Sequence, residues 1–365
     1  MFRHKRVRGV ASTIAGLLTL TVLGCGIAVN PSSSSSGPAQ SQSKQSTGPV
    51  LGYVWDVPSQ SLLPVQGVAG ASILGTATVS ATSQGHSFIA SAISGISGRA
   101  LFLDANGGVF QGSVTGGPLT KVANISGATS LILSNSGGYA VVTGKSADGA
   151  SIASVISGLP TSPSTRNLTL ASAASVFGAA ASDTGTVALA TGSGQSEVTI
   201  VAFVGPAVGV QVATTQAFGG MQFVPSSDEL VVADGGSGAL TAIARVNTTP
   251  SSSSLSSAGG ITAPVALDIT SNGRWVVAAN HHGDVLRIDL TGVAATMKVH
   301  CSCAPSQVLA LNGSANGAGT TVRLVTPGGG PLWIVDAGNT SPRVLFIPAI
   351  TTAGILPTLT PKSAM

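Results

Sequence analysis

Hydrophobic and polar residues alternate with a short period over residues 265–290, the clearest unit of the chain. Apolar residues occupy every second position of residues 265–270, as in a strand with one buried face. Residues 275–279 form a continuous apolar run, which is expected of a strand buried on both faces. Residues 285–290 alternate again, and the segments between these runs are polar and contain Gly, as tight turns require. The unit predicts three antiparallel strands.

The remainder of the chain can be divided into weaker copies of this unit. The turn before the central buried strand recurs every 40 to 47 residues, at Gly52, Gly98, Gly138, Gly185, Asp228, Gly273 and Gly319. A fourth, edge strand with a weaker pattern is expected at residues 208–213 and 295–300. A period of about 40–45 residues with four short strands is typical of a β-propeller. We therefore predict an all-β fold, a single seven-bladed β-propeller over residues 50–350. Six blades are the alternative, if residues 52–68 only add strands to a neighbour.

Two copies of the unit resemble a known repeat family. Residues 230–234 read LVVAD, and residues 275–280 read WVVAAN and are followed by VLRID at 285–289. These residues resemble the YVTN family of β-propeller repeats, in which a polar turn precedes an L-Y-V-A-N strand and a V-x-V-I-D strand. The Tyr of that pattern is absent here. The resemblance implies a fold and no particular activity.

The two ends of the repeat predict how the ring closes. The first unit lacks an innermost strand, because a Ser-rich segment precedes it, and the last unit has a spare strand at residues 343–348 or 355–360. We expect a C-terminal strand, with residues 351–365 as the tail, to complete the first blade and remove an open edge. The Ser-rich residues 250–260 are expected to form a solvated loop, as are residues 313–319.

The first 49 residues predict an export signal and a tether. Residues 1–24 combine a basic start with an apolar run, a signal-peptide pattern too short for a comfortable membrane span. The end of this segment, Val22-Leu23-Gly24-Cys25, resembles the lipobox of bacterial lipoproteins, in which the Cys is acylated and becomes the mature N-terminus. This resemblance implies lipidation of Cys25, with an ordinary secretory leader or an uncleaved anchor as alternatives. Residues 25–49, rich in Ser and Gln, predict a disordered tether. The absence of an acidic residue after Cys25 favours the outer membrane of a bacterial envelope.

The charge of the chain excludes one class of partner. Only 8% of the residues are charged, against about 25% in a typical soluble domain. Four of the 16 basic residues precede Cys25 and no acidic residue does, so removal of residues 1–24 leaves 12 basic and 12 acidic residues. A formally neutral chain has no basic surface with which to bind nucleic acid.

The cysteines after residue 25 form one close pair. Cys301 and Cys303 lie two residues apart and next to His300. An even pair in an exported chain is usually oxidised, so we predict a disulfide, which needs a local turn. Free thiols are one alternative, and a Cu or Zn site formed by His300, Cys301 and Cys303 is another. The adjacent His281 and His282 are interpreted as a solvated turn.

Short polar side chains end several predicted strands, at Asp56, Asp104, Asp234, Asn280 and Asp336. Capping of turns is one explanation. The other is a propeller-type hydrolase or lactonase, in which Asp104, Asp234 and Asn280 converge on a metal ion in the central channel. The sequence contains neither a Ca²⁺ loop nor a nucleophile elbow in a strand–turn–helix context. The three tryptophans are expected in the core.

These patterns favour a non-catalytic binding or scaffolding module without a cofactor. The module would be held on a membrane by a lipid on Cys25 and located in the bacterial cell envelope. Loops of Ser, Thr, Asn and Gly would present backbone and hydroxyl groups to an envelope protein or a polysaccharide. The hydrolase remains the alternative.

Overall fold

A computed structural model provides the structure of the chain. It describes residues 48–94, 96–171, 174–194, 197–205, 209–256, 260–311, 319–327 and 331–348. The predicted signal peptide, Cys25, nearly all of the tether and the tail at 351–365 lie outside these residues. In the described part, no helix has the length and apolar character needed to cross a membrane.

The described residues form seven antiparallel sheets, each made of four consecutive strands. We number these sheets as blades 1 to 7. Blade 1 contains β1 (Val50–Asp56), β2 (Ser61–Val68), β3 (Ala71–Leu74) and β4 (Val79–Ser80), and blade 2 contains β5 (Phe88–Ser94), β6 (Arg99–Asp104), β7 (Gly108–Ser113) and β8 (Thr120–Asn124). Blade 3 contains β9 (Ala128–Leu133), β10 (Ala140–Lys145), β11 (Ser151–Ser157) and β12 (Ser164–Asn167), and blade 4 contains β13 (Ser175–Ala181), β14 (Val187–Gly192), β15 (Val198–Phe203) and β16 (Val210–Thr215). Blade 5 contains β17 (Phe218–Phe223), β18 (Leu230–Asp234), β19 (Leu240–Ala244) and β20 (Ser251–Ser256), and blade 6 contains β21 (Pro264–Ile269), β22 (Trp275–Asn280), β23 (Asp284–Asp289) and β24 (Met297–His300). Blade 7 contains β25 (Gln307–Ala310), β26 (Thr321–Val325), β27 (Leu332–Asp336) and β28 (Arg343–Ile347). A single turn of 3₁₀ helix, η1 (Thr82–Gln84), follows blade 1.

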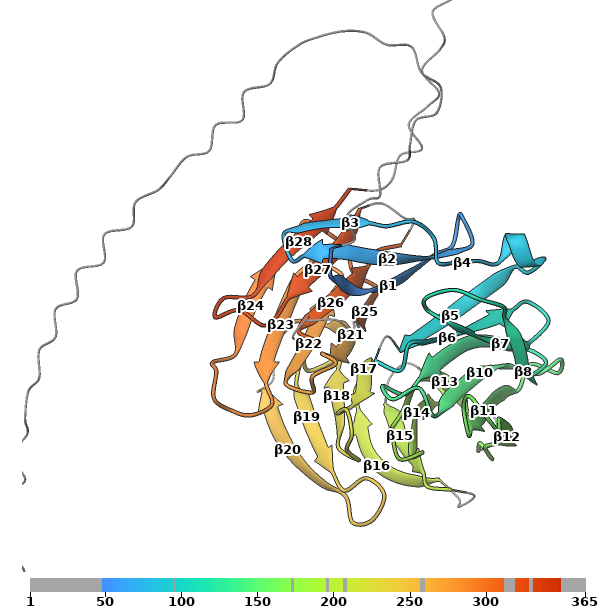
Figure 1. Cartoon of the computed structure of the whole chain (residues 1–365). Coiled ribbons are helices and arrows are strands. Elements are labelled where there is room, and N and C mark those ends of the chain that lie inside the picture. The colour runs from blue at the N-terminus through green and yellow to red at the C-terminus, as the bar shows by residue number, and fades with distance from the viewer. Residues whose placement is uncertain are drawn as a thin grey trace, which may run out of the picture. The chain divides into compact units, whose positions relative to one another are not determined.

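The blades follow one another around a ring in chain order, and blade 1 lies beside blade 7 (Figure 1). In blades 2 to 7 the strands pair in the order first, second, third, fourth. The prediction of an all-β, seven-bladed propeller is therefore confirmed, and the six-bladed alternative is wrong. The three strands expected within residues 265–290 are β21, β22 and β23.

The hydrophobic core lies between the blades rather than within them. The described residues form seven apolar clusters, and each cluster combines side chains from two neighbouring blades. Alternate side chains of a strand point to opposite faces of its sheet, so the second strand of a blade contributes to both adjacent clusters. In β22, for example, Val277 packs toward blade 7 and Val276 packs toward blade 5. This position explains the continuous apolar runs of the sequence.

Blade 1 differs from the prediction in two respects. Its first strand, β1, contributes Tyr53 and Trp55 to the wall of the central channel, so the blade does not lack an innermost strand. Gly52 lies within β1 rather than in the turn before the second strand. The run LGYVWDV was assigned to the wrong strand because its hydrophobic pattern suits either position.

Blade 1 is also narrower than the others, because β3 and β4 both pair with β2. The carbonyl of Pro64 in β2 accepts a hydrogen bond from the backbone of Gly75, on the side where β3 and β4 lie. The N–H and C=O groups of one residue point to the same side of a strand, and proline lacks the N–H. The outer ladder is therefore interrupted at Pro64, and β3 pairs beyond it while β4 pairs before it.

The ring does not close as expected at residues 343–348. The strand β28 pairs with β27 and is the outermost strand of blade 7. The other candidate, residues 355–360, lies outside the described residues. Within the described residues, blades 1 and 7 meet through an apolar cluster that includes Val54, Val65, Leu311 and Ile334.

The Ser-rich segment 250–260 is not simply a loop. Residues Ser251–Ser256 form β20, the outermost strand of blade 5, which pairs with β19 through its backbone. Its serines carry no hydrophobic pattern, so the side chains give no sign of the strand. Most of the other predicted loop, residues 313–319, lies outside the described residues.

Candidate functional site: the central channel and the turn face

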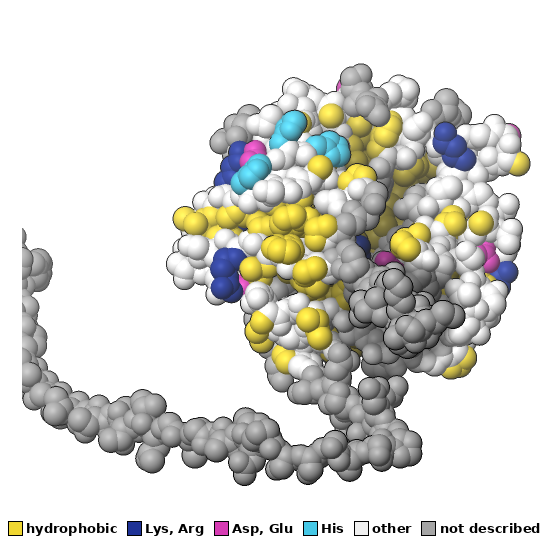
Figure 2. Space-filling model, turned by 90° about the horizontal axis from the view of Figure 1, so that it is seen from above, with side chains coloured by type: hydrophobic (Ala, Val, Ile, Leu, Met, Phe, Trp, Pro, Cys, Tyr) yellow, Lys and Arg dark blue, Asp and Glu magenta, His cyan; other side chains and the backbone are white. Residues whose placement is uncertain are grey.

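A central channel of about 680 Å³ runs between the first strands of the seven blades. Its wall includes large apolar side chains, among them Tyr53, Trp55, Phe177 and Phe218. Two further residues come from a second strand, Arg323 and Val325 of β26. Figure 2 shows a hollow near the middle of one face of the molecule. A volume of several hundred Å³ is ordinary for a small-molecule site.

One buried carboxyl group ties three blades together beside this channel. Asp268 of β21 accepts hydrogen bonds from Nε2 of Gln222 (3.0 Å) and from the backbone N–H of Ala310 (2.6 Å) and Ile269 (2.7 Å). Burial raises the pKa of Asp268 to about 6, although these three donors act to lower it. The group therefore titrates within the range of ordinary biological pH.

A second carboxylate joins three blades at one end of the propeller. In blades 2 to 7 the strands alternate in direction, so the turns between first and second strands and between third and fourth strands lie at this end, which we call the turn face. The first turn of blade 1 lies at the opposite end, where Gln60 is hydrogen-bonded to Phe88, the first residue of β5. Asp183, in the first turn of blade 4, accepts hydrogen bonds from the backbone N–H of Ser136 in blade 3 (2.6 Å) and of Ser226 in blade 5 (2.8 Å).

Similar contacts continue around the turn face. The hydroxyl of Ser94 in blade 2 donates to the carbonyl of Asn135 in blade 3 (2.6 Å). The hydroxyl of Thr184 donates to the carboxylate of Asp228, which links blades 4 and 5. Between blades 6 and 7 the backbone N–H of Asn272 donates to the carbonyl of Gly319 (3.3 Å). These turns hold one another in place, so the turn face is a preorganised surface.

The predicted channel residues Asp104, Asp234 and Asn280 do not converge. Each side chain caps its own turn at the end of a second strand, in blades 2, 5 and 6. Asp104 accepts hydrogen bonds from the N–H groups of Asn106 (2.8 Å) and Gly108 (2.7 Å). None of the three lines the channel.

The other two capping candidates are bound locally as well. Asp56 accepts a hydrogen bond from the N–H of Ser59 (3.0 Å). Asp336 pairs with the guanidinium of Arg343 (3.0 Å) and accepts from the N–H of Gly338 (3.2 Å). The capping explanation therefore holds for these side chains, and the hydrolase alternative is not favoured.

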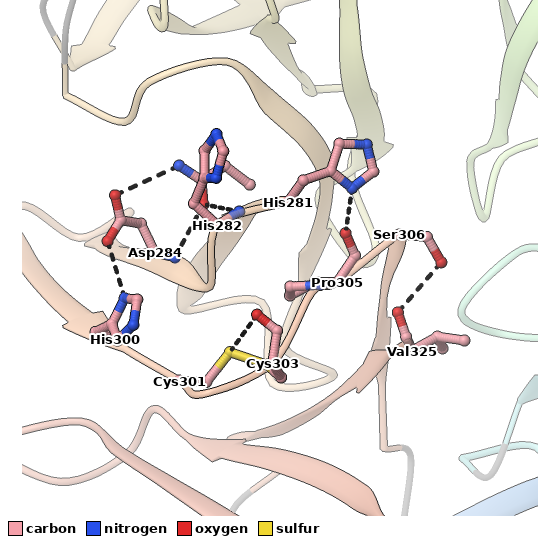
Figure 3. The surroundings of a disulfide bond; sticks show 10 residues. His281, His282, Asp284, His300, Cys301, Cys303, Pro305, Ser306 and Val325 are labelled. Carbon is pink, nitrogen blue, oxygen red and sulfur yellow. Dashed lines mark hydrogen bonds and ion pairs between the residues drawn. A yellow bond between two sulfur atoms is a disulfide. The ribbon is translucent and has the colours of Figure 1, made fainter. Parts of the chain in front are cut away.

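The cysteine pair lies in the segment that leads from blade 6 to blade 7 (Figure 3). The sulfur atoms of Cys301 and Cys303 are bonded to each other, and the two Cα atoms are 5.1 Å apart. Gly283 lies against this segment with φ of 84°, where a Cβ atom would be 2.1 Å from the carbonyl oxygen of Cys301. The backbone can pass this closely only because residue 283 is a glycine.

Three histidines surround the cysteine pair without forming one site. Nδ1 of His281 is 3.0 Å from the carbonyl oxygen of Pro305, and Nδ1 of His300 is 3.3 Å from Asp284. His281 and His282 are exposed in their turn. Among the described residues no group of three or more His, Cys, Asp or Glu side chains is arranged to hold a metal ion. A site formed by His300, Cys301 and Cys303 would need both sulfurs as thiolates, and each is in the disulfide.

The sequence did not identify Asp183, Asp268 or Arg323 as functional residues. All three lie in the wall of the channel. Asp268 and Arg323 are charged residues within strands that are otherwise mostly apolar, and this was the available signal. The tryptophans follow the expectation only in part. Trp55 is buried but also contributes to the channel wall, whereas Trp275 is buried between blades 6 and 7.

Comparison of the chain with models of protein families found no match, and no curated protein matches it. Solved structures do match its fold. A functionally unknown protein from Desulfotomaculum acetoxidans is 13% identical with a TM-score of 0.53, and the match covers 81% of this chain and 99% of that chain. The β-propeller domain of Cps50 (Swd1) from Myceliophteria thermophila is 15% identical with a TM-score of 0.50, covering 71% of this chain and 86% of that chain. A chain of a mitotic checkpoint complex is 11% identical with a TM-score of 0.50, covering 90% and 91%. At these identities the comparisons show the fold alone, and the chain has a β-propeller fold.

Proposed function

We propose that this protein is a non-catalytic binding or scaffolding module of the bacterial cell envelope. In this proposal a lipid on Cys25 holds it on a membrane, residues 25–49 act as the tether, and the propeller presents one face to an envelope protein. A polysaccharide is the alternative occupant. The lipobox-like sequence supports the anchor, and the lack of an acidic residue after Cys25 supports the outer membrane. One neighbour in fold is a chain of the mitotic checkpoint complex, and propellers commonly act as interaction scaffolds.

The observation that carries the proposal is the combination of rigidity and exposed apolar side chains at the turn face. Aliphatic side chains in its turns remain accessible to solvent: Ile96 (48% exposed), Val204 (41%) and Val293 (83%). Apolar groups on a surface fixed by hydrogen bonds between blades support docking, because little conformational entropy is lost on binding. Protein partners use such groups at the centre of an interface.

Two substitutions separate the turn face from the rest of the surface. Val293→Asp places a charge in a turn of blade 6, on the turn face. Val57→Asp is a matched control, because Val57 is also exposed to 58% and its turn lies beside Phe88, at the end opposite to the turn face. Neither residue belongs to the buried core, so both variants should fold.

The test is cross-linking of the full-length protein in cells, followed by detergent extraction and mass spectrometry. We expect one envelope protein to be recovered with the wild type and with Val57→Asp, and to be lost with Val293→Asp. Cys25→Ser should release the protein from the membrane fraction. Equal recovery with both aspartate variants would exclude the turn face. The anchor proposal fails if Cys25→Ser stays with the membrane.

A further inference from the structure

Arg323 occupies an unusual position in the wall of the central channel. It lies on β26, and Ile334 of β27 is directly opposite it. Directly paired residues point to the same face of a sheet. Ile334 packs against Val54 and Val65 of blade 1, so Arg323 also faces blade 1. The side chain therefore lies where the first and last blades meet, next to the channel that it lines.

The guanidinium of Arg323 has no hydrogen-bond or ion-pair partner among the described residues, and its Nε atom is buried. Burial lowers the pKa of Arg323, and the charge of Asp56 only partly opposes this effect. An arginine nevertheless remains charged at neutral pH. A buried cation without a partner is unfavourable by several kcal/mol in general, which makes such a group uncommon outside binding sites.

Arg287 shows how this fold satisfies a buried arginine when the role is structural. Its side chain is fully buried in blade 6 and stacks on Trp275, with the guanidinium carbon 4.2 Å from the ring centroid. Its nitrogen atoms donate to the backbone carbonyls of Ala337 (3.0 Å), Asn339 and Thr340 (3.4 Å). Nε of Arg287 has no partner, as in Arg323, but the terminal nitrogens of Arg323 have none of these carbonyl contacts among the described residues.

The acidic residues in the channel wall do not neutralise Arg323. Asp183 and Asp268 are the two carboxyl groups that line the channel. Both oxygens of each already accept hydrogen bonds from backbone or amide N–H groups. Neither carboxylate is paired with Arg323, so the donors of this guanidinium are available to a ligand.

In the rest of the channel wall, accessible apolar side chains alternate with polar ones such as Ser91 and Gln307. Ile89 and Leu309 are 48% and 43% exposed, and both line the channel. Tyr53, Trp55 and Phe218 add aromatic surface. A cation at one point of a partly apolar cavity is complementary to a molecule with one anionic end and an apolar body.

We propose that the central channel binds a small amphipathic carboxylate, with Arg323 holding the carboxylate and the apolar side chains of the wall covering the hydrocarbon part. Two parallel N–H···O bonds from the guanidinium fix the carboxylate, since the two groups match in shape. The proposal rests on Arg323 and the channel wall, and not on the exposed side chains of the turn face, so it does not depend on the function proposed above.

The test is titration calorimetry with decanoate as the probe, below the concentration at which it forms micelles. Decanol has the same apolar body without the charge, and decyltrimethylammonium has the opposite charge. We expect decanoate to bind with one site per chain, decanol about 10- to 100-fold more weakly, and the cation not at all. Quenching of Trp55 fluorescence gives a second signal, because this ring lines the channel.

Two variants of the full chain make the assignment specific. Arg323→Gln should weaken decanoate binding about 10- to 100-fold and leave decanol unchanged. Arg166→Gln is the matched control, because Arg166 lies on β12, the outermost strand of blade 3, and should bind like the wild type. If Arg323→Gln does not fold, the comparison of the three probes on the wild type still decides. Equal affinity for decanoate and decanol, no binding of decanoate, or unchanged binding by Arg323→Gln would each overturn the proposal.

Discussion

Blade 6 and blade 1 contain four strands each, but they are built differently. In blade 6 every strand pairs with the next, and the register shifts once, between Pro264 and Ala266 of β21. In blade 1 the two short strands β3 and β4 share the outer edge of β2. Charged side chains anchor blade 6, where Trp275 is stacked between Arg274 (4.5 Å) and Arg287 (4.2 Å). Blade 1 meets blade 7 mainly through apolar packing.

The difference shows what a repeat specifies and what it leaves open. The spacing of apolar runs and turns is enough to build a blade, because each strand pairs with its neighbour in sequence. Closure of the ring needs contacts between blades that are farthest apart in the chain, and no local pattern encodes these. In blade 1, Gly52 lies in close contact with blade 7, and Pro64 ends the hydrogen-bond ladder on the outer edge of β2.

The largest effect is expected from Arg287→Ala, which removes the anchor of blade 6. Three backbone carbonyls would lose their donor and Trp275 would lose one stacking partner, so the free energy of unfolding should fall by about 3–4 kcal/mol. Guanidinium chloride unfolding followed by circular dichroism measures this change. Arg166→Ala, on an outermost strand, should change it by less than about 0.5 kcal/mol. A loss below about 1 kcal/mol would mean that Arg287 does not hold blades 6 and 7 together.

A comparable test applies to the closure between blades 1 and 7. A Cβ atom at Gly52 would lie 2.9 Å from Cβ of Leu311, which is too close for two carbon atoms. Gly52→Ala should therefore destabilise the protein by about 1–3 kcal/mol, because blade 1 must shift away from blade 7. Gly138→Ala is the control, since the nearest atom to its Cβ would be Oγ of Ser136 at 3.6 Å. Equal melting temperatures for the two variants would contradict the close packing at this seam.

Asp268 makes the inner ring of blade 6 sensitive to pH. Its pKa is raised from 3.8 to about 6 in the folded protein, so the folded state binds this proton more tightly than the unfolded state. The stabilising contribution of the protonated group is complete below about pH 4 and is lost as the pH rises through about 6. Asp268→Asn should remove this dependence, leaving the unfolding free energy flatter between pH 4 and 7. The variant should also be about 1–2 kcal/mol less stable, because its amide N–H₂ cannot accept the hydrogen bond from Ala310. An unchanged pH profile would contradict the raised pKa.

The smallest effect is expected at the outer edge of blade 6. Nζ of Lys298 is 2.9 Å from Asp284, and the two side chains are 46% and 26% exposed. Lys298→Met should reduce stability by less than about 1 kcal/mol, and the difference should vanish in concentrated salt. Differential scanning calorimetry beside Lys121→Met, on the outermost strand of blade 2, measures it. A larger loss would show that edge charges matter more in blade 6 than exposure indicates.

The sequence predicts the regular blades well because their pattern is local. Residues 275–279 and 285–290 were expected as the second and third strands of a unit, and they correspond to β22 and β23. The strand β20 was missed because serines pair through their backbone and leave no periodic signal. Gly52 was assigned to a turn because a glycine before an apolar run looks the same in both positions.

The candidate site is less predictable than the fold. The alternation within residues 321–325 shows that Arg323 points to the opposite face of the strand from Val322 and Leu324. It does not show what packs against that opposite face. That neighbour is blade 1, more than 250 residues earlier in the chain. The capping residues illustrate the reverse case, because the side-chain oxygens of Asp104 and Asn280 accept hydrogen bonds from N–H groups within four residues of them. Local chemistry could be predicted, and convergence between distant blades could not.

The exposed edge strand β20 affects the solubility of this protein. Four of its residues are exposed, and all four are serines. Many proteins protect the exposed edge of a sheet with lysines, whose electrostatic repulsion weakens when salt is added. Hydroxyl groups instead retain their water at any ionic strength. The outer edge of blade 5 should therefore resist self-association equally well in dilute buffer and in sodium chloride. Only salts that are strongly excluded from the protein surface, such as sulfate, should promote aggregation.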